Sequence, residues 1–161
     1  MTVALPTVPP VGAPAPDFTL LTDRGEPLTL SALRGRVVVL YFYPKDDTTT
    51  CTVEACEFRD HFPRFDDAGA VVLGVSPDSV KSHVKFRAKY DLPFTLLADT
   101  EHAVAESYGV WREKSMYGRR YMGVERTTFV IGTDGRIAGL FEKVKSRGHA
   151  EAVAAVVAGL A

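Results

Sequence analysis

The sequence has few cysteines, almost no net charge and no long hydrophobic run. Only two cysteines occur among 161 residues, which excludes a secreted scaffold held by several disulfides and turns attention to the reactivity of those two thiols. Nineteen Lys and Arg residues face 20 Asp and Glu residues, so no overall field favours nucleic acid or an anionic membrane as a partner. No apolar run approaches the roughly 18 residues that span a bilayer. We therefore expect one compact soluble domain.

The first sixteen residues contain no charged side chain and half of the chain's ten prolines. Because proline fixes φ and lacks an N–H donor, we expect residues 1–16 to form an extended arm and residues 17–161 to form a single domain. No Lys or Arg precedes an apolar core in this arm, as a secretory signal would require. The predicted compartment is therefore the cytoplasm.

Short β-rich runs alternate with longer helical runs along the domain. Residues 37–43 and 71–75 are apolar runs typical of strands buried on both faces, and the helical run from Cys51 to about Phe65 joins them into a parallel βαβ unit. Residues 127–131 and 137–141 flank an Asp-Gly turn that is typical of an antiparallel hairpin. This pattern predicts an α/β protein with a central mixed β-sheet flanked by helices on both faces, the arrangement of a thioredoxin-like fold. Further predicted elements are a hairpin over 17–30, helices over 79–89 and 101–108, a strand over 94–97 and a C-terminal helix.

Cys51 follows the first long strand, at the place where loops and helix N-termini converge in open α/β sheets. Thr48, Thr49 and Thr50 are all candidate N-cap residues, so Cys51 falls in the first turn of the next helix. Free backbone N–H groups and the helix dipole there favour the thiolate, which is the nucleophilic form. The alternative is that Cys51 is a small buried apolar residue.

Cys56 lies five residues after Cys51 on the same predicted helix. Five helical residues advance about 7.5 Å and turn about 140°, beyond the roughly 7 Å Cα separation that an unstrained disulfide tolerates. A disulfide between the two would therefore require the first helical turns to unwind. The other interpretation is that Cys56 is a core residue one turn past the site. The four histidines show no paired spacing that would indicate a zinc site, and a C-x-x-C motif is absent.

Residues 41–60, YFYPKDDTTTCTVEACEFRD, resemble the active site of peroxiredoxins of the bacterioferritin comigratory protein group, also called peroxiredoxin Q. The P-x-x-x-T-x-x-C pattern of Pro44, Thr48 and Cys51 is the most specific part of the likeness. The similarity covers nearly everything from about Val11 onward. Three further segments carry it: GVSPDSVKSHVKFRAKYDLPFTLLAD (74–99), YGVWREKSMYGRRYMGVERTTFVI (108–131) and GTDGRI (132–137).

The resemblance implies a thiol peroxidase. Cys51 would attack the O–O bond of hydrogen peroxide or a small organic hydroperoxide and become a sulfenic acid. Cys56 matches the resolving cysteine found in part of the family, which closes an intramolecular disulfide. The resemblance also implies that no cofactor or metal takes part, that a thioredoxin-type protein supplies the electrons, and that the protein is a monomer.

Four further side chains acquire expected roles from the resemblance. Arg126 fits the active-site arginine of the family, and its guanidinium, with the Thr48 hydroxyl, would stabilise charge on the leaving oxygen. Pro44 would shield the site and fix the entry to the loop. Glu54, one helical turn from Cys51, opposes ionisation of the thiol unless a cation such as Arg126 engages it. Without the resemblance, Arg126 would be taken for a solvated surface charge.

Other polar residues near the site have ordinary interpretations. Thr49 and Thr50 stand where Pro-Gly commonly precedes the reactive cysteine of this family, and their β-branched side chains bring bulk to the backbone. The Thr50 hydroxyl is a candidate helix cap or peroxide contact. Asp46 and Asp47 are interpreted as solvated loop residues, and the basic segment 112–126 as a solvated loop that could contact an anionic reductant. The aromatic residues in or beside that segment are interpreted as packing residues: Trp111, Tyr117 and Tyr121.

Two other classes of protein remain compatible with the residues. A thioredoxin-fold redox sensor would bind a partner when oxidised and use the same disulfide as a signal. A binding module that keeps the fold would leave Cys51 no more reactive toward peroxide than a free thiol. Steady-state turnover with a reductant separates the enzyme from both.

Overall fold

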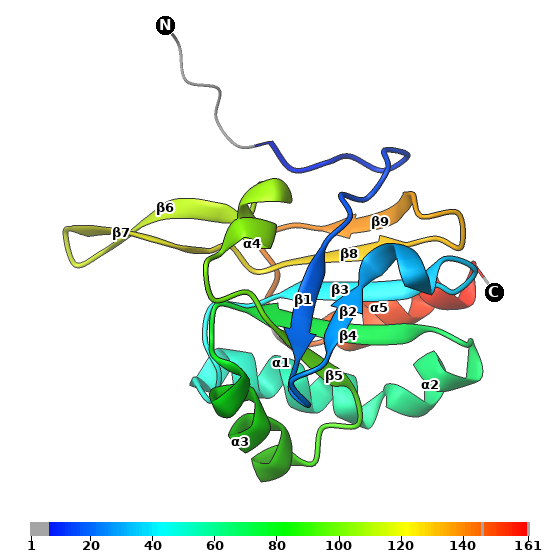
Figure 1. Ribbon diagram of the computed structural model, residues 1–161, viewed down its shortest axis with the longest axis horizontal. Helices are drawn as coiled ribbons and strands as arrows, with labels where there is room; N and C mark the ends of the chain where they lie inside the picture. Colours follow the sequence, from blue (N-terminus) through cyan, green and yellow to red (C-terminus); the bar gives the residue numbers. More distant parts are fainter. Residues whose placement is uncertain (1–6, 146, 161) are drawn as a thin grey trace, which may run out of the picture.

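The structure is a computed structural model that describes residues 7–145 and 147–160. Its centre is a seven-stranded sheet in the order β2-β1-β5-β4-β3-β8-β9 (Figure 1). The buried strands β3 (Val38–Phe42) and β4 (Val71–Ser76) pair in parallel, while β8 (Thr127–Ile131) runs antiparallel on the other side of β3 and pairs with β9 (Ile137–Phe141). The predicted mixed sheet is confirmed.

The other edge of the sheet contains the predicted N-terminal hairpin. Strand β1 (Thr19–Thr22) pairs antiparallel with β2 (Pro27–Thr29) and with β5 (Thr95–Ala98). Strand β5 in turn pairs in parallel with β4. The N-terminal hairpin is therefore joined through β5 to the central strands of the same sheet.

Helices cover both faces of the sheet, as predicted. Their bounds are α1 (Thr49–Asp60), α2 (Phe62–Asp67), α3 (Val80–Tyr90) and α5 (His149–Ala158) on one face, and the 3₁₀ helix η1 (Leu30–Leu33) and α4 (Ala103–Ser107) on the other. Helices α1, α2, α3 and α5 contribute side chains to one buried cluster, which also contains Val39, Tyr41 and Tyr43. The alternate residues of β3 enter a second cluster on the opposite face. In Figure 1, α1, α2 and α3 lie in the lower part of the molecule, and α4 lies in the upper part, to the left of β8 and β9.

The single helix predicted over 51–65 is wrong, because the chain divides it into α1 and α2. The break is at His61, which has φ −95° and ψ 2° and accordingly stands between the two helices. Pro63 lies in the first turn of α2, where its missing N–H has no intrahelical partner to lose. In the interior of a single long helix Pro63 would remove a backbone hydrogen bond, whereas at the start of α2 it does not.

The solvated loop predicted over 112–126 is also wrong for most of its length. It forms a two-stranded antiparallel sheet from β6 (Trp111–Met116) and β7 (Arg119–Val124), which extends away from the body (Figure 1). Tyr117 and Gly118 form its two-residue turn with φ of 53° and 77°, the left-handed backbone that such hairpins need. Tyr117 is 98% exposed and Tyr121 44% exposed, so neither packs in the core.

The described part of the N-terminal arm lies beside the turn between β8 and β9. Residues 1–6 of the predicted arm lie outside the described residues. Pro14 forms an isolated antiparallel bridge with Arg136. The N–H of Gly12 donates to the carbonyl oxygen of Ile137 at 2.8 Å, and the N–H of Ile137 donates to Ala13 at 2.9 Å. This stretch is therefore attached to the domain through short backbone pairing.

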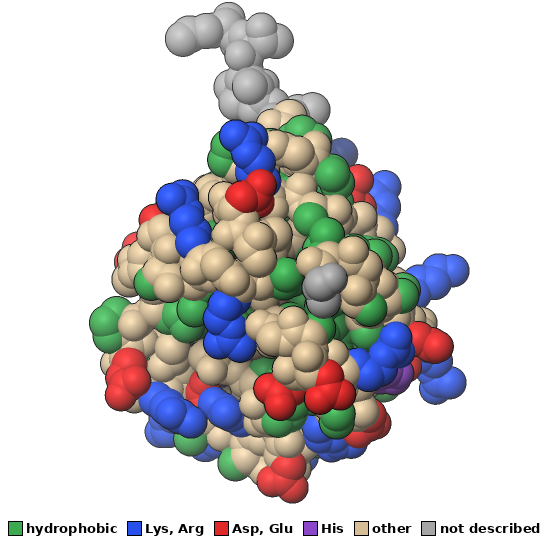
Figure 2. All heavy atoms as spheres, turned by 90° about the vertical axis from the view of Figure 1, so that its right-hand side faces the viewer, with side chains coloured by type: hydrophobic (Ala, Val, Ile, Leu, Met, Phe, Trp, Pro, Cys, Tyr) green, Lys and Arg blue, Asp and Glu red, His purple; other side chains and the backbone are tan. Residues whose placement is uncertain are grey.

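The surface carries charges of both signs. On the face shown in Figure 2, acidic and basic side chains are interspersed without a large area of one sign. Across residues 7–145 and 147–160, the structure contains no helix with the length and apolar character needed to cross a membrane.

Candidate active site

Cys51 lies in the first turn of α1, just beyond the end of β3. Thr48 is the N-cap residue, with φ −90° and ψ 156°, and its carbonyl oxygen accepts the N–H of Thr52 at 2.8 Å. The predicted position of Cys51 at a helix start is therefore confirmed. Its side chain is a free thiol and only 1% exposed. The unpaired N–H groups of the first turn of a helix favour negative charge at its N-terminus.

One guanidinium connects Cys51 to Glu54. Arg126 is the residue immediately before β8, which pairs antiparallel with β3. Its Nη2 donates to Sγ of Cys51 at 3.1 Å, and its Nη1 donates to Oε1 of Glu54 at 2.6 Å. The Glu54 side chain is 1% exposed and the Arg126 side chain 11% exposed. The structure thus brings together three of the predicted site residues in a nearly dry environment, where charge interactions are strong.

Burial and pairing shift the titration of this pair. Burial raises the pKa of Glu54 to about 7, although the Arg126 guanidinium opposes that rise. Burial alone would lower the pKa of Arg126, but Glu54 and Cys51 together raise it above its ordinary value. The guanidinium therefore stays charged. A fixed cation thus lies at hydrogen-bond distance from the Cys51 sulfur.

The inner wall of the site is uncharged. Burial, with added effects of Glu54 and Cys51, raises the pKa of Tyr41 well above its ordinary value. The Tyr41 ring stacks on Phe58 of α1 with centroids 4.6 Å apart. Burial lowers the pKa of His149 to about 4, with Arg126 acting in the same direction. Both groups are therefore neutral at pH 7, whereas Arg126 is a cation that hydrogen-bonds to sulfur.

Two buried oxygens of this region have no hydrogen-bond partner among the described residues. They are Tyr41 Oη and Glu54 Oε2. A buried polar atom without a partner loses its hydration and gains nothing in exchange. The missing partner for Oε2 is consistent with the raised pKa of Glu54, because a proton on the carboxyl group removes its charge.

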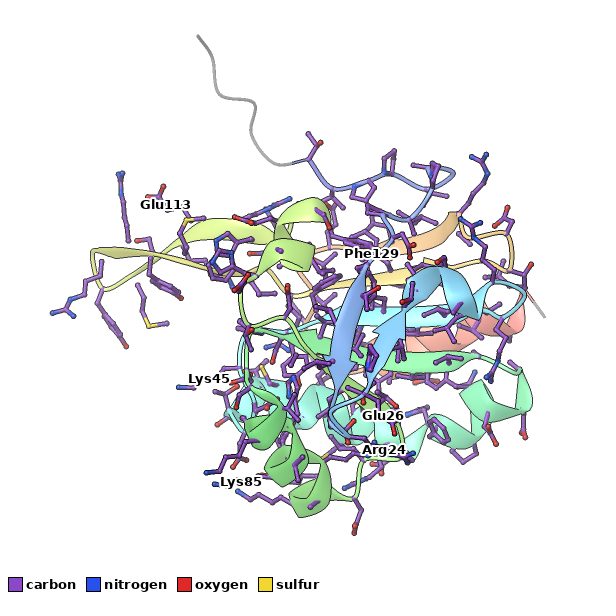
Figure 3. The ribbon with its side chains drawn as sticks, in the orientation of Figure 1. Arg24, Glu26, Lys45, Lys85, Glu113 and Phe129 are labelled. Atoms are coloured by element: carbon purple, nitrogen blue, oxygen red, sulfur yellow. The ribbon has the colours of Figure 1, made fainter. Side chains whose placement is uncertain are left out.

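The remaining predicted residues lie in the loop before α1 and at its start. Pro44 is half-buried, directly after the sheet. The exposed Thr48 hydroxyl donates to the carbonyl oxygen of Lys45 at 3.0 Å. Thr50 is exposed in the first turn, and of the three candidate caps the structure selects Thr48 as the N-cap residue. Figure 3 shows Lys45, which lies in this loop, at the edge of the molecule near α3 and below the β6–β7 hairpin that carries Glu113.

Cys56 belongs to the same continuous helix as Cys51. It is half-buried and is also a free thiol. Because α1 is intact from Thr49 to Asp60, the two cysteines have the separation of about 7.5 Å along the axis expected for a regular helix. The described conformation is therefore the one in which the two thiols are kept apart.

Sequence interpretation missed a buried carboxylate beside the site. Asp46, interpreted as a solvated residue, is only 8% exposed. It accepts hydrogen bonds from the hydroxyls of Tyr43 at 2.6 Å and Ser82 at 2.8 Å and contacts Nδ1 of His83 at 2.7 Å. Two of these partners are 36 and 37 residues away in sequence, so no local pattern announces them.

No metal centre is indicated in this region or elsewhere in the described chain. Over residues 7–145 and 147–160, no three His, Cys, Asp or Glu side chains are grouped so that they could hold a metal ion. The groups in contact at Cys51 are a thiol, a guanidinium and a buried carboxyl group.

Comparison with known proteins places this geometry in a family. The AhpC/TSA family model matches residues 11–139. A putative peroxiredoxin bcp of Coxiella burnetii is 55% identical over 139 residues, which cover 86% of this chain and 92% of that protein. Peroxiredoxin Bcp of Bacillus subtilis is 50% identical over 139 residues, covering 86% and 88%.

Solved structures give the same relationship. Peroxiredoxin Q of Xanthomonas campestris superimposes with a TM-score of 0.87 at 42% identity, covering 92% of this chain and 97% of that one. A second structure of the X. campestris bacterioferritin comigratory protein, described in connection with alkyl peroxide reduction, has a TM-score of 0.87 at 41% identity, covering 93% and 98%. The expected thioredoxin-like fold is confirmed by these neighbours. The chain therefore belongs to the AhpC/TSA family, within the group of Bcp and peroxiredoxin Q proteins.

Proposed function

We propose that this chain is a thiol-dependent peroxidase that reduces hydrogen peroxide and small organic hydroperoxides through Cys51. The observation that carries the proposal is the 3.1 Å contact between Arg126 Nη2 and Cys51 Sγ at the start of α1. A thiolate at that place is both stabilised and positioned for attack. The X. campestris relative, described in connection with alkyl peroxide reduction, supports the same class of substrate.

In the first step, the Cys51 thiolate attacks the terminal oxygen of the hydroperoxide. An S–O bond forms, the O–O bond breaks, and sulfur is oxidised to a sulfenic acid. The leaving oxygen takes a proton and departs as water or an alcohol. Arg126 would stabilise the charge that develops on that oxygen more than it stabilises the bound peroxide, which is what lowers the barrier.

Four more residues support this step in the proposal. Glu54 holds the guanidinium of Arg126 by the 2.6 Å hydrogen bond. Pro44 shields the thiolate and fixes the entry to the loop. The Thr48 hydroxyl would turn from the Lys45 carbonyl to the peroxide when substrate binds, and Thr50 stands beside it as a second hydroxyl at the helix start.

In the second step, the Cys56 thiolate attacks the sulfenic sulfur. A disulfide forms and the hydroxyl of the sulfenic acid leaves with a proton as water. Because one continuous helix separates Cys51 from Cys56, the first turns of α1 must unwind before the sulfurs can meet. Peroxide reduction and disulfide formation would thus use two conformations of the same segment.

A thioredoxin-type protein would return the disulfide to two thiols by thiol–disulfide exchange, with no metal or organic cofactor. A pair of thiols that must be reduced in every cycle suits the reducing cytoplasm.

Cys51, Cys56, Glu54 and Arg126 all belong to one chain, so the reaction needs no second copy, and we propose a monomer. We also propose that the peroxidase domain begins at residue 17, after the Pro-rich stretch.

The test is steady-state peroxide consumption coupled to thioredoxin, thioredoxin reductase and NADPH. We expect Cys51→Ser to abolish turnover, because the attacking sulfur is gone. We expect Cys56→Ser to consume one equivalent of peroxide and then to stall or to depend on an added thiol. Multiple turnover in Cys51→Ser would overturn the proposed function. Unchanged thioredoxin-supported cycling in Cys56→Ser would instead show a one-cysteine mechanism.

A further inference from the structure

The loop that leads into α1 is anchored to α3 by Asp46. The carboxylate oxygen Oδ1 accepts the Tyr43 hydroxyl at 2.6 Å, while Oδ2 accepts the Ser82 hydroxyl at 2.8 Å and contacts His83 Nδ1 at 2.7 Å. The N–H of Asp46 donates to Asp78 Oδ2 at 2.8 Å. One loop residue is thus bound to the end of β3, to α3 and to the segment after β4.

His83 is completely buried and both of its ring nitrogens face acceptors. Nδ1 is 2.7 Å from the Asp46 carboxylate, and Nε2 is 2.8 Å from the carbonyl oxygen of Leu97. A carbonyl oxygen can only accept, so Nε2 carries a hydrogen and donates it to Leu97. The contact between Asp46 and His83 is therefore a short hydrogen bond shielded from solvent, with side chains 4% and 0% exposed.

A buried polar contact of this kind fixes the relative position of its two residues more than it adds to stability. Removing two polar groups from water costs about as much as their hydrogen bond returns, so a well-packed apolar pair would stabilise the fold as well. The pair tolerates only an arrangement in which every hydrogen bond is made. The contact joins the loop to β3, to α3 and to the segment after β4. Its most direct explanation is that it fixes the position of the residues that follow in this loop.

The anchored loop leads directly to the reactive cysteine. Only residues 47–50 separate Asp46 from Cys51, and all four are exposed, so core packing does not fix them. Asp47 is held at φ 57° by Lys89 Nζ and the Tyr90 hydroxyl, each 2.8 Å from its carboxylate. Both contacts again come from α3. The start of α1 is therefore located by α3 on one side and by Arg126 on the other.

We propose that Asp46 and His83 are positioning residues that hold Cys51 against the Arg126 guanidinium. The inference rests on the proposed peroxidase function and adds to it the device that fixes the reacting atoms. The clamp, defined as Asp46, His83, Ser82 and Tyr43, touches no substrate. Loosening it shifts the start of α1 and lengthens the contact between Sγ and Nη2, and a misplacement of about 1 Å can cost on the order of 100-fold in rate.

The test is the second-order rate constant for oxidation of Cys51 by hydrogen peroxide, measured by stopped-flow competition against a haem peroxidase. We expect Asp46→Asn and His83→Asn to lower this constant by about tenfold or more. Ser82→Ala removes one neutral donor and keeps the contact between Asp46 and His83, and we expect it to lower the constant by about fivefold. This milder variant answers the question even where Asp46→Asn or His83→Asn fails to fold.

The matched control is Asp23→Asn. Asp23 is as buried as Asp46 and also pairs with α3, through Arg87 Nη1 at 2.8 and 3.1 Å, but it anchors the helix to the β1–β2 turn. We expect it to lower the melting temperature and to leave the rate constant within about twofold. A structural role alone would instead make the rate loss follow the loss of stability in all variants.

A second readout separates positioning from general loosening. Because the clamp and Arg126 act on one contact, their effects should not multiply. We expect Asp46→Asn or Ser82→Ala to slow oxidation much less in an Arg126→Lys background than in the wild-type protein. The inference is overturned by a folded clamp variant that reacts at the wild-type rate, by equal slowing in Asp23→Asn, or by fully multiplicative effects. A wild-type Cys51 no faster than a free thiol would overturn the proposed function itself.

Discussion

Arg126 Nη2 lies 3.1 Å from Cys51 Sγ, although the two residues are 75 positions apart in the sequence. The contact joins a helix start to the residue before an adjacent strand. Nη1 of the same guanidinium is held by Glu54 at 2.6 Å. The cation is therefore fixed before peroxide arrives, and its alignment costs little reorganisation during the reaction.

Replacement of Arg126 is the first prediction. Arg126→Gln keeps a donor but removes the charge, and we expect the rate of Cys51 oxidation by peroxide to fall by about 100- to 1,000-fold, as for loss of a donor to a developing oxyanion. Arg126→Lys is the matched control, because it keeps the charge but cannot contact Cys51 and Glu54 with two separate nitrogens. Its rate should lie between those of the wild-type protein and Arg126→Gln. Stopped-flow kinetics measures both. Equal rates for Arg126→Lys and Arg126→Gln would contradict a role for the charge.

The pH dependence of stability is the second prediction. The pKa of Glu54 is raised from 4.5 to about 7, so the native state binds the extra proton and the free energy of unfolding falls as pH rises from 4.5 to 7. The pKa of His149 is lowered from 6.5 to about 4, so the unfolded state binds the extra proton and the free energy of unfolding falls as pH drops from 6.5 to 4. Each slope is at most about 1.4 kcal/mol per pH unit.

Between pH 4.5 and 6.5 these two slopes have opposite signs and largely cancel in the wild-type protein. We expect stability to rise more steeply with pH in Glu54→Gln than in the wild type across this window, and to fall more steeply with pH in His149→Gln. Urea unfolding at several pH values measures the differences between the three proteins, in which the other titrating groups cancel. Parallel curves for all three would contradict the assigned environments.

Close packing of Tyr41 on Gly74 gives the third prediction. A Cβ atom at Gly74 would lie 2.9 Å from Tyr41 Oη and 2.9 Å from Leu96 Cδ2. We expect Gly74→Ala to lower the free energy of unfolding by about 1–3 kcal/mol through overpacking. Tyr41→Phe removes the buried hydroxyl that has no described partner, so it should be neutral or stabilising and should reduce the cost of Gly74→Ala. Urea unfolding of the two single variants and the double variant checks this, and additive costs would contradict it.

Unwinding of α1 is the fourth prediction. After oxidation by one equivalent of peroxide, we expect the backbone amides between Cys51 and Cys56 to exchange hydrogen much faster than in the dithiol form, because the disulfide cannot be made in an intact helix. Amides of β3 and β4 should keep their protection. Hydrogen exchange followed by mass spectrometry compares the two forms, with Cys56→Ser treated in the same way as the control. Unchanged protection in a protein shown to contain the disulfide would refute the unwinding.

Most of the central sheet could be predicted because its strands are continuous apolar runs. Residues 37–43 and 71–75 became β3 and β4 with few changes at their ends. The β6–β7 hairpin was missed because it is exposed along most of its length, so its strands show no apolar alternation. Its two-residue turn, Tyr117-Gly118, was the available signal, since glycine there adopts positive φ at low cost.

The site could be predicted only in part. Cys51 follows from local pattern, because candidate caps and a strand end place it at a helix start. A single arginine has no pattern of its own, and Arg126 was selected through resemblance to a family. Asp46 was misinterpreted because its partners Ser82 and His83 come from α3, far along the chain. Contacts made by tertiary structure leave no periodicity in the sequence.

The most direct test of the account is thiol counting by mass spectrometry after stoichiometric hydrogen peroxide and rapid alkylation. We expect the wild-type protein to lose two hydrogens in a species that links Cys51 to Cys56, and Cys56→Ser to retain a sulfenic acid on Cys51. Both cysteines recovered as alkylated thiols, with peroxide unconsumed, would contradict the claim that this sulfur reduces peroxide.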